Sequence, residues 1–600
     1  ATRGDHSALA KEKKKSTTKA PGKPGQLKPY ADLIKNRVVI EGLFTFYYDT
    51  TDNSMLMAVK PDQLGPLFIW AVTRTQGDGQ FYDNGAMGQT FPFYIKRVGK
   101  RLLFLEKNLR LRADSTSPVF KAVQSGISDG LYASTAIKSA PDKKTGAVLI
   151  DPTPLFIRDI DHTSFFLGQA AQTGFSFDKN NSYFLETKSF PENSEISVRL
   201  HFRSGRPISG PAHQNPYSFF LTYHHSLSLL KQTDYIPRIA DERVGYFQTL
   251  YQDYTHLDTS TAYVRYIDRW DLRKKDPEAR VSEPVEPIVY WVENTVPEEY
   301  RDAIAEGIEV WNYAFEKAGF KNAIVAKQMP DTASWDPADV RYNVVRWMVQ
   351  PGAGYAVGPH RANPFTGQIY DADIRISSDF IRFMYSVSQE WIEPVTTREG
   401  ASFDPNAFLD SLSHFELSPP NPYSCDYAAE TIRDAAFGLA YLQATLGDLA
   451  GKDSLVKEYV HSYLVELVTH EVGHTLGLRH NFAASTIHTL EEISDRNFTK
   501  KYGVTGSVMD YGAPNLPPPG YPQGEFYNSR PGPYDNWAIE YGYTPFGAAK
   551  PEDELPQLQK IASRSTEPFL VYATDEDAFG TSMKSIDPRV HLHDMGADPL

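Results

Sequence analysis

The chain has 600 residues, of which 41% are hydrophobic, and its formal net charge is −14 at pH 7. This length exceeds what one hydrophobic core supports, so we expect two to four domains. No apolar run approaches the ~18 residues of a membrane helix, which excludes a spanning segment, and the acidic balance argues against nucleic acid as a partner. The single cysteine, Cys425, excludes an internal disulfide and any metal site built on several thiolates.

The N-terminal part of the chain combines a basic segment with strand patterns. Residues 1–28 are rich in Lys, Pro and Gly, and we expect a flexible tail, with a basic arm for an anionic surface as the alternative. Residues 29–275 contain short runs of β-branched and aromatic residues between Gly, Asp and Pro, which predicts a β-rich domain. Within it, the run DERVGYFQTLY (residues 241–251) is distinctive, and its simplest interpretation is a packed strand after a turn.

A second domain is expected after a linker. Residues 276–287 are charged and rich in Pro, which is typical of a boundary. Strand and amphipathic-helix patterns then alternate over residues 288–545, with an inserted segment at 380–452. Residues 546–600 are loop-like, and we expect them to begin a C-terminal region that continues beyond Leu600. The predicted fold class is therefore α+β and multidomain, with a β-rich N-terminal domain before an α/β domain.

The stretch THEVGHTLGLRHNF (residues 469–482) carries three histidines and a glutamate. Apolar residues recur at helical spacing over residues 453–476, so His470 and His474 are expected one turn apart on one face of a helix. Two imidazoles in that arrangement can hold one Zn²⁺. Glu471 follows the first of them, where its carboxylate can reach a water on the metal without ligating the metal itself.

A third ligand follows from the glycine after this helix. Gly477 can adopt the left-handed conformation that ends a helix and reverses the chain. The reversal is expected to return His480 to the metal as third ligand and to leave a fourth position open, as a catalytic zinc requires. The alternative is a helix with unrelated histidines, which the complete spacing H-E-x-x-H-x-x-G-x-x-H makes far less attractive.

This spacing resembles that of the metzincin clan of zinc endopeptidases. The run GSVMDYG (residues 506–512) resembles the methionine turn of that clan, with Met509 as a hydrophobic floor under the metal. The run YDNWAIEYGY (residues 534–543) resembles the helix that closes the clan's catalytic domains. The resemblance implies that residues 288–545 form a metzincin-like domain with a twisted mixed sheet, a long active-site helix and a Met-turn.

The chain resembles the large bacterial Met-zincin family more closely, through DERVGYF, RWDLRKKDP and HEVGHTLGLRHNF. In that family a β-rich domain of unknown function precedes the metal domain. The resemblance implies a bacterial zinc metalloprotease that is secreted or located in the cell envelope. The residue after the third histidine is Asn481, which matches neither the acidic residue of astacins and adamalysins nor the serine of matrixins, so their substrate preferences are not carried over.

The implied activity is zinc-dependent endopeptidase hydrolysis by a zinc-activated water, with Glu471 as general base and then general acid. Tyr511 falls where astacin-like enzymes place a tyrosine near the metal, so it is either an oxyanion donor or a packed turn residue. Cys425 lies in the catalytic half, which favours a buried structural cysteine over a thiolate that blocks the zinc.

The expected partner is a protein or peptide substrate. Residues 369–377 alternate like a strand and resemble the edge strand above the zinc in metzincins, so we expect the substrate to bind there in extended form. The alternative is an interior strand. The proline-rich loop at 512–532 is expected to wall the pocket beyond the cleaved bond, unless it is a mere connector. The oligomeric state stays open.

Two other functions compete with an endopeptidase. One is a zinc-containing binding or scaffold protein of the cell envelope with little proteolytic activity. Glu471 argues against it, because a purely structural zinc needs no general base. The other is a zinc hydrolase that acts on a non-protein substrate, which only the resemblance disfavours.

Overall fold

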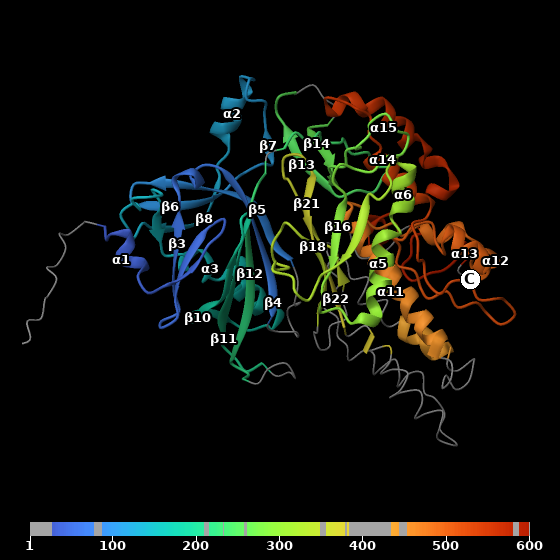
Figure 1. Ribbon diagram of the computed structural model, residues 1–600, viewed down its shortest axis with the longest axis horizontal. Coiled ribbons are helices and arrows are strands. Elements are labelled where there is room, and N and C mark those ends of the chain that lie inside the picture. The colour runs from blue at the N-terminus through green and yellow to red at the C-terminus, as the bar shows by residue number, and fades with distance from the viewer. Residues whose placement is uncertain are drawn as a thin grey trace, which may run out of the picture.

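The computed structural model describes residues 27–76, 87–208, 215–231, 233–256, 261–348, 356–378, 381–382, 384, 434–442, 453–579, 587 and 589–598. These residues form a β-rich N-terminal region, followed by a mixed region of helices and strands (Figure 1). The two regions lie side by side, and each contains a large hydrophobic core of its own.

A seven-stranded antiparallel sheet forms most of the N-terminal region, in the order β10-β11-β12-β4-β5-β6-β8. Hydrophobic and polar residues alternate along β11. Ile196, Val198 and Leu200 point into the core, and the residues between them are polar. The core surrounds Trp70 and includes side chains of a four-stranded sheet, β1-β2-β3-β9. The elements are α1 (Tyr30–Ile34), β1 (Val38–Ile40), β2 (Thr45–Asp49), β3 (Ser54–Val59), β4 (Leu67–Gln76), β5 (Met87–Val98), β6 (Arg101–Glu106), β7 (Leu111–Arg112), α2 (Val119–Gly126), β8 (Gly130–Ala136), β9 (Val148–Ile150), α3 (Thr153–Phe156), α4 (Thr163–Ala170), β10 (Phe175–Ser189), β11 (Asn193–Ser204) and β12 (Ser218–Leu229).

The second region is built on a five-stranded mixed sheet in the order β17-β16-β18-β22-β19. The first four strands are parallel, and β19 is antiparallel to β22. Helices α5 and α11 pack against each other beside this sheet (Figure 1). Gly307 of α5 permits the close approach, because a Cβ there would lie 2.7 Å from Val468 Cβ. The elements are β16 (Ile288–Val292), α5 (Glu298–Glu309), α6 (Asn312–Lys317), β17 (Ile324–Gln328), β18 (Asn343–Met348), β19 (Ala356–Val357), β22 (Ile374–Ser377), α11 (Asp453–Thr475), α12 (Leu490–Ser494), α13 (Arg496–Tyr502), α14 (Pro533–Tyr543), α15 (Leu555–Ala562) and α16 (Asp575–Phe579).

Residues that precede the expected linker also belong to the second core. Val244, Tyr246, Ile267 and Leu272 pack in the same hydrophobic core as the side chains of α11. They flank or lie on β13 (Gln248–Asp253), β14 (Tyr263–Ile267) and β15 (Arg269–Trp270), and β15 pairs with β21 (Gln368–Ala372), which in turn pairs with β20 (His360–Ala362). The division into folding units at residues 276–287 stays a prediction.

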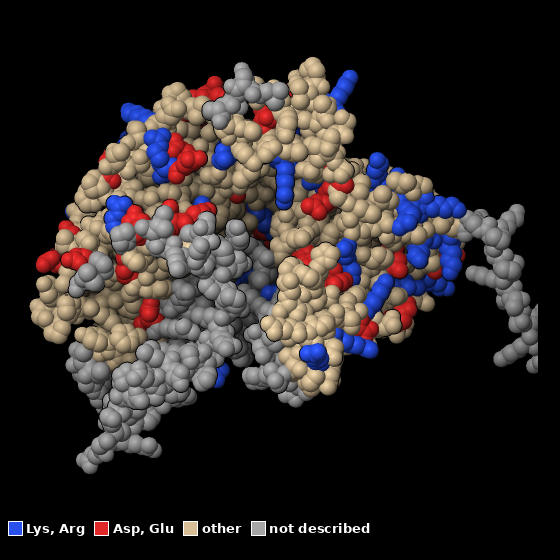
Figure 2. Space-filling model, turned by 180° about the vertical axis from the view of Figure 1, so that it is seen from behind, with Lys and Arg blue, Asp and Glu red and all other residues tan. Residues whose placement is uncertain are grey.

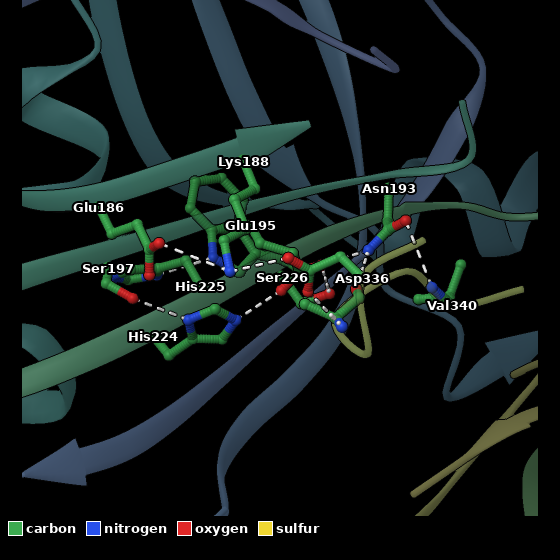
Figure 3. A network of polar contacts seen from close by, with 12 residues as sticks. Glu186, Lys188, Asn193, Glu195, Ser197, His224, His225, Ser226, Asp336 and Val340 are labelled. Carbon is green, nitrogen blue, oxygen red and sulfur yellow. Dashed lines mark hydrogen bonds and ion pairs between the residues drawn. The ribbon is translucent and has the colours of Figure 1, made fainter. Parts of the chain in front are cut away.

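A polar network joins the two regions (Figure 3). Glu195 of β11 is buried and accepts hydrogen bonds from His224 Nε2 at 2.5 Å and Ser226 Oγ at 2.6 Å. Arg361 of the second region donates to Ser226 Oγ at 2.8 Å. Because Glu195 is buried and the members of this network come from both regions, these contacts help to fix how the N-terminal sheet meets the region that carries α11.

The prediction that residues 369–377 form one edge strand is wrong. The chain forms two strands there, β21 and β22, separated by Asp373. β21 lies between β15 and β20, and β22 lies between β18 and β19, so each has a neighbour on both sides. Alternation of side chains along a strand reports which faces are buried, not whether a further strand pairs with it. The edge of the five-stranded sheet nearest to β22 is β19.

Two further expectations differ in detail or lie outside the described residues. The first amphipathic-helix pattern in residues 288–545 is divided between two helices, α5 and α6. Cys425 and most of the inserted segment at 380–452 are not among the described residues. No helix in the described part of the chain is long and apolar enough to cross a membrane.

The acidic net charge is unevenly distributed. In the view of Figure 2, Lys and Arg side chains gather over the N-terminal region, at the right of the picture. The hairpin between β5 and β6 contributes four exposed basic residues, Lys96, Arg97, Lys100 and Arg101. Nearly all of the basic segment at 1–28 lies outside the described residues, so its role as tail or arm stays open.

Candidate metal centre

Helix α11 carries the first two histidines into the second core. From Val460 to its end nearly every side chain of α11 is buried, and His470 and His474 are 0% and 4% exposed. The helix ends at Thr475, and Gly477 follows with a φ of +96°, which lies in the left-handed region. There the amide of Leu478 donates to Gly473 O at 3.0 Å, which is the bond that closes a helix through a left-handed glycine. The following residues turn back toward the helix.

The turn brings His480 beside the two helical histidines. One ligand atom from each of His470, His474 and His480 lies within 4.8 Å of the others, and all three residues are buried. His474 Nε2 and His480 Nε2 are 3.1 Å apart. Two nitrogens at roughly 2.0–2.1 Å from one tetrahedral Zn²⁺ lie about 3.4 Å apart, so the spacing suits one ion.

The protonation of these rings also suits a metal. His470 Nδ1 donates to Val508 O at 2.8 Å, and His474 Nδ1 donates to Leu478 O at 2.9 Å, which leaves Nε2 unprotonated on both. Burial lowers the pKa of His474 to about 3 and that of His470 well below its usual value, so both rings are neutral. A cation between these two rings would accept a nitrogen lone pair from each. The group therefore fits a metal ion.

A segment from the N-terminal half holds the turn between the second and third histidines. Tyr246 pairs with Leu478 as an antiparallel bridge, and its neighbours exchange backbone hydrogen bonds with residues 477 and 479 at 2.8 and 3.0 Å. The Tyr246 hydroxyl donates to Ala538 O of α14 at 2.7 Å. A Cβ on Gly477 would lie 2.0 Å from Asp268 O, so only glycine fits this contact. The distinctive run at 241–251 thus lies at the metal centre, a location that its strand-like pattern did not predict.

The segment at residues 506–512, which resembles a Met-turn, is held in place by α14. The carboxylate of Asp535 accepts hydrogen bonds from Ser507 Oγ at 2.6 Å and from the amides of Val508 and Gly532, each at 2.8 Å. Burial raises the pKa of Asp535 to about 7, although these hydrogen bonds act in the opposite direction. Val508 O accepts the hydrogen bond from His470 Nδ1, so Asp535 holds the backbone that orients this histidine. Asp535 and His470 are 65 positions apart in the sequence.

Glu471 is enclosed beside the histidine group. It is 0% exposed, and burial raises the pKa of its carboxyl to about 8 against the lowering effect of a hydrogen bond from the Gly358 amide. A Cβ on Gly358 would lie 2.4 Å from Glu471 O, so the backbone that follows β19 touches α11 at this residue. The glutamate therefore sits between the histidines and the edge of the sheet.

Tyr511 also lies at the histidine group. It is 3% exposed, and its hydroxyl is 3.1 Å from His480 Nε2. Its ring packs edge-on against the His480 ring, with centroids 4.8 Å apart. The phenol is thus at the position from which it can contact a group bound at the metal centre. Met509 is fully buried under α11.

One residue of the metal centre, Asp575, was not predicted from the sequence. Asp575 Oδ1 is 2.7 Å from His480 Nδ1, although it belongs to the segment expected to lie outside the catalytic domain. No spacing links Asp575 to the histidine motif, since 95 residues separate them. Its neighbours in TDED resemble an ordinary helix start, so the sequence held no signal for this contact.

The comparisons with known proteins agree with this geometry. Residues 452–600 match the family model described as Met-zincin. Residues 85–275 match a model described as Domain of unknown function (DUF5117). No curated protein and no solved structure matched the chain. The Met-zincin match implies Zn²⁺ as the cofactor, in agreement with the buried histidine group. Residues 452–600 are thus a Met-zincin domain, which supports a metzincin-type metalloprotease.

Proposed function

We propose that this protein is a zinc-dependent endopeptidase in which Glu471 transfers the protons of peptide-bond hydrolysis. The observation that carries the proposal is a fully buried glutamate between three metal-competent histidines and the edge of a β-sheet. Burial of a carboxyl costs stability. A purely structural metal site gives no reason to place one there.

Each chain group has a distinct task in this proposal. Zn²⁺ held by His470, His474 and His480 would supply Lewis acidity, which polarises the scissile carbonyl and makes water more acidic. Glu471 accepts the proton of the attacking water and then delivers it to the leaving amine.

Tyr511 is proposed as the oxyanion donor. Its hydroxyl lies near His480 Nε2, so a small movement directs its proton at a carbonyl oxygen bound in the centre. The packed-turn interpretation predicts instead that removal of the hydroxyl changes stability alone.

The substrate is proposed to pair with β19. Among the described strands β19 has one neighbour, β22, and it lies at the edge of its sheet. An extended peptide can add itself there as a further strand. Gly358 follows β19 and contacts Glu471, so a peptide paired with β19 would pass close to this glutamate. This replaces residues 369–377 as the docking strand. The loop at 512–532 stays the proposed wall beyond the cleaved bond, and an extracytoplasmic location stays an expectation from the family resemblance.

The test compares Glu471→Gln with Glu458→Gln. Glu458 is also on α11, but its side chain is 40% exposed. We expect Glu471→Gln to retain zinc and to lose ~10²–10⁴-fold in turnover, and Glu458→Gln to match the wild type. The assay is mass spectrometry of a long peptide blocked at both ends. Internal cuts support an endopeptidase. A wild-type protein that binds zinc and never cuts would favour the scaffold or non-protein hydrolase.

A further inference from the structure

We propose that Asp575 is the positioning residue of the third metal-binding histidine, and that Asn481 holds it in place. The inference rests on the zinc site proposed above and extends it to a carboxylate that the catalytic steps do not use. It also assigns a task to the residue that follows the third histidine, the position at which this chain departs from better-known metzincins.

The three histidines are oriented in different ways. His470 and His474 are fixed by α11 and donate their Nδ1 protons to backbone carbonyls. His480 comes from the turn after the helix, and its Nδ1 faces a carboxylate, Asp575 Oδ1, at 2.7 Å. A carboxylate partner orients an imidazole and increases the electron density on its other nitrogen. His480, which lies outside the helix, therefore has a charged partner, whereas the two helical histidines have neutral carbonyl partners.

The second oxygen of Asp575 is held separately. Arg479 donates to Asp575 Oδ2 at 3.1 Å, and Thr574 Oγ1 donates to the same oxygen, also at 3.1 Å. Arg479 also donates to Glu576 Oε2 at 2.6 Å. With Oδ2 occupied by these donors, Oδ1 is directed at His480. These contacts orient the carboxylate independently of its contact with His480.

Asn481 secures the segment that brings Asp575 to this place. Its Nδ2 donates to Val571 O at 2.9 Å, and its Oδ1 accepts from the amide of Ala573 at 3.2 Å. The amide of Phe482 donates to Ala573 O at 2.8 Å. Asn481 is 0% exposed, so these contacts are shielded from water. An acid or a serine at this position could not make both side-chain bonds, because an ionised carboxylate lacks the N–H donor and a hydroxyl is shorter.

Charge supports the same assignment. Three neutral imidazoles leave the charge of a divalent ion uncompensated, and a carboxylate in contact with one ligand offsets part of it. Removal of such a partner typically lowers metal affinity by ~10–100-fold. Asp575 should therefore matter for how tightly zinc is held, beyond any effect on folding.

The experiment measures zinc transfer from the holoprotein to a colorimetric chelator. We expect Asp575→Ala to weaken zinc binding by ~10–100-fold. Asp575→Asn keeps an acceptor oxygen but loses the charge, so its loss should be smaller. Glu576→Gln is the matched control, because it removes the neighbouring charge and the other partner of Arg479; its zinc affinity should equal that of the wild type.

Asn481→Ala tests the second half of the proposal. It should weaken zinc binding in the same direction, and the double variant Asn481→Ala/Asp575→Ala should lose less than the product of the two single losses, because both act through one contact. Circular dichroism of each variant at low temperature establishes that it is folded.

Two results would overturn the inference. One is a folded Asp575→Ala protein with wild-type zinc affinity. The other is an equal loss in Asp575→Ala and Glu576→Gln, which would indicate a general charge effect. If instead the wild-type protein holds no zinc at all, the proposed metal site itself has failed, and that outcome is seen before any variant is compared.

Discussion

Met509 packs against Gly473 so closely that no side chain fits between them. A Cβ on Gly473 would lie 2.2 Å from Met509 Sδ and 3.0 Å from Trp311 Cζ2. Gly473 lies on α11 directly before His474, and Met509 lies in the segment at residues 506–512. This segment and α11 are therefore in direct contact, and the contact requires a glycine at position 473.

Gly473→Ala should consequently disturb the centre although alanine favours a helix. The added methyl group must displace Met509 or the buried Trp311, and overpacking of this kind costs about 1–3 kcal/mol. We expect a lower free energy of unfolding in urea and weaker zinc retention. Gly473→Ala/Met509→Ala should recover part of the loss, since the smaller side chain leaves room. A fully stable Gly473→Ala protein would contradict the contact.

Tyr511→Phe separates catalysis from packing at the second proposed catalytic residue. The ring stays, and only the hydroxyl near His480 is lost. If the hydroxyl stabilises an oxyanion, kcat should fall by roughly 10²–10³-fold with zinc content and melting temperature nearly unchanged. The measurement is peptide cleavage beside metal analysis of the same sample. Unchanged kcat would leave Tyr511 with a packing role alone.

Asp535 should make the stability of the protein depend on pH. Its pKa is raised from 3.8 to about 7 in the folded protein, mainly by burial. Between these values the folded state keeps a proton that the unfolded state releases, so the free energy of unfolding falls as pH rises from about 4 to about 7. The shift corresponds to about 4 kcal/mol at most.

The measurement for Asp535 is the difference in unfolding free energy between the wild type and Asp535→Asn over this pH range. An asparagine can accept from the same amides but does not titrate. The wild type should lose stability relative to the variant as pH rises, while contributions from the histidines cancel in the difference. A constant difference, or one that grows in favour of the wild type, would show that Asp535 is ionised in the fold.

A chain that begins at residue 276 should fail to form the metal centre. It lacks residues 244–270, whose backbone pairs with the turn at 477–479 and whose Trp270 Nε1 donates to Thr475 O at 2.9 Å. We expect low zinc content for residues 276–600 and higher content for residues 231–600, by elemental analysis after gel filtration. Equal zinc content in both would restore the boundary at 276–287 as the division between folding units.

The sequence by itself determined the local part of the metal centre. His470 and His474 are one helical turn apart wherever the helix forms, and Gly477 sets the reversal that precedes His480. These relations depend on backbone geometry over a dozen residues, so the spacing of the letters predicts them. The Met-zincin match and the zinc it implies agree with that prediction.

The support of the centre was decided by tertiary structure. Asp535, Asp575 and Tyr246 reach it from segments about 30 to 230 positions away in the sequence, through contacts that no local periodicity encodes. The same limit explains the error at residues 369–377, because alternation defines the buried face of a strand but leaves its neighbours unspecified. Pairing at a sheet edge is settled by the other strands that fold against it, and among the described strands β19 takes this edge of the sheet.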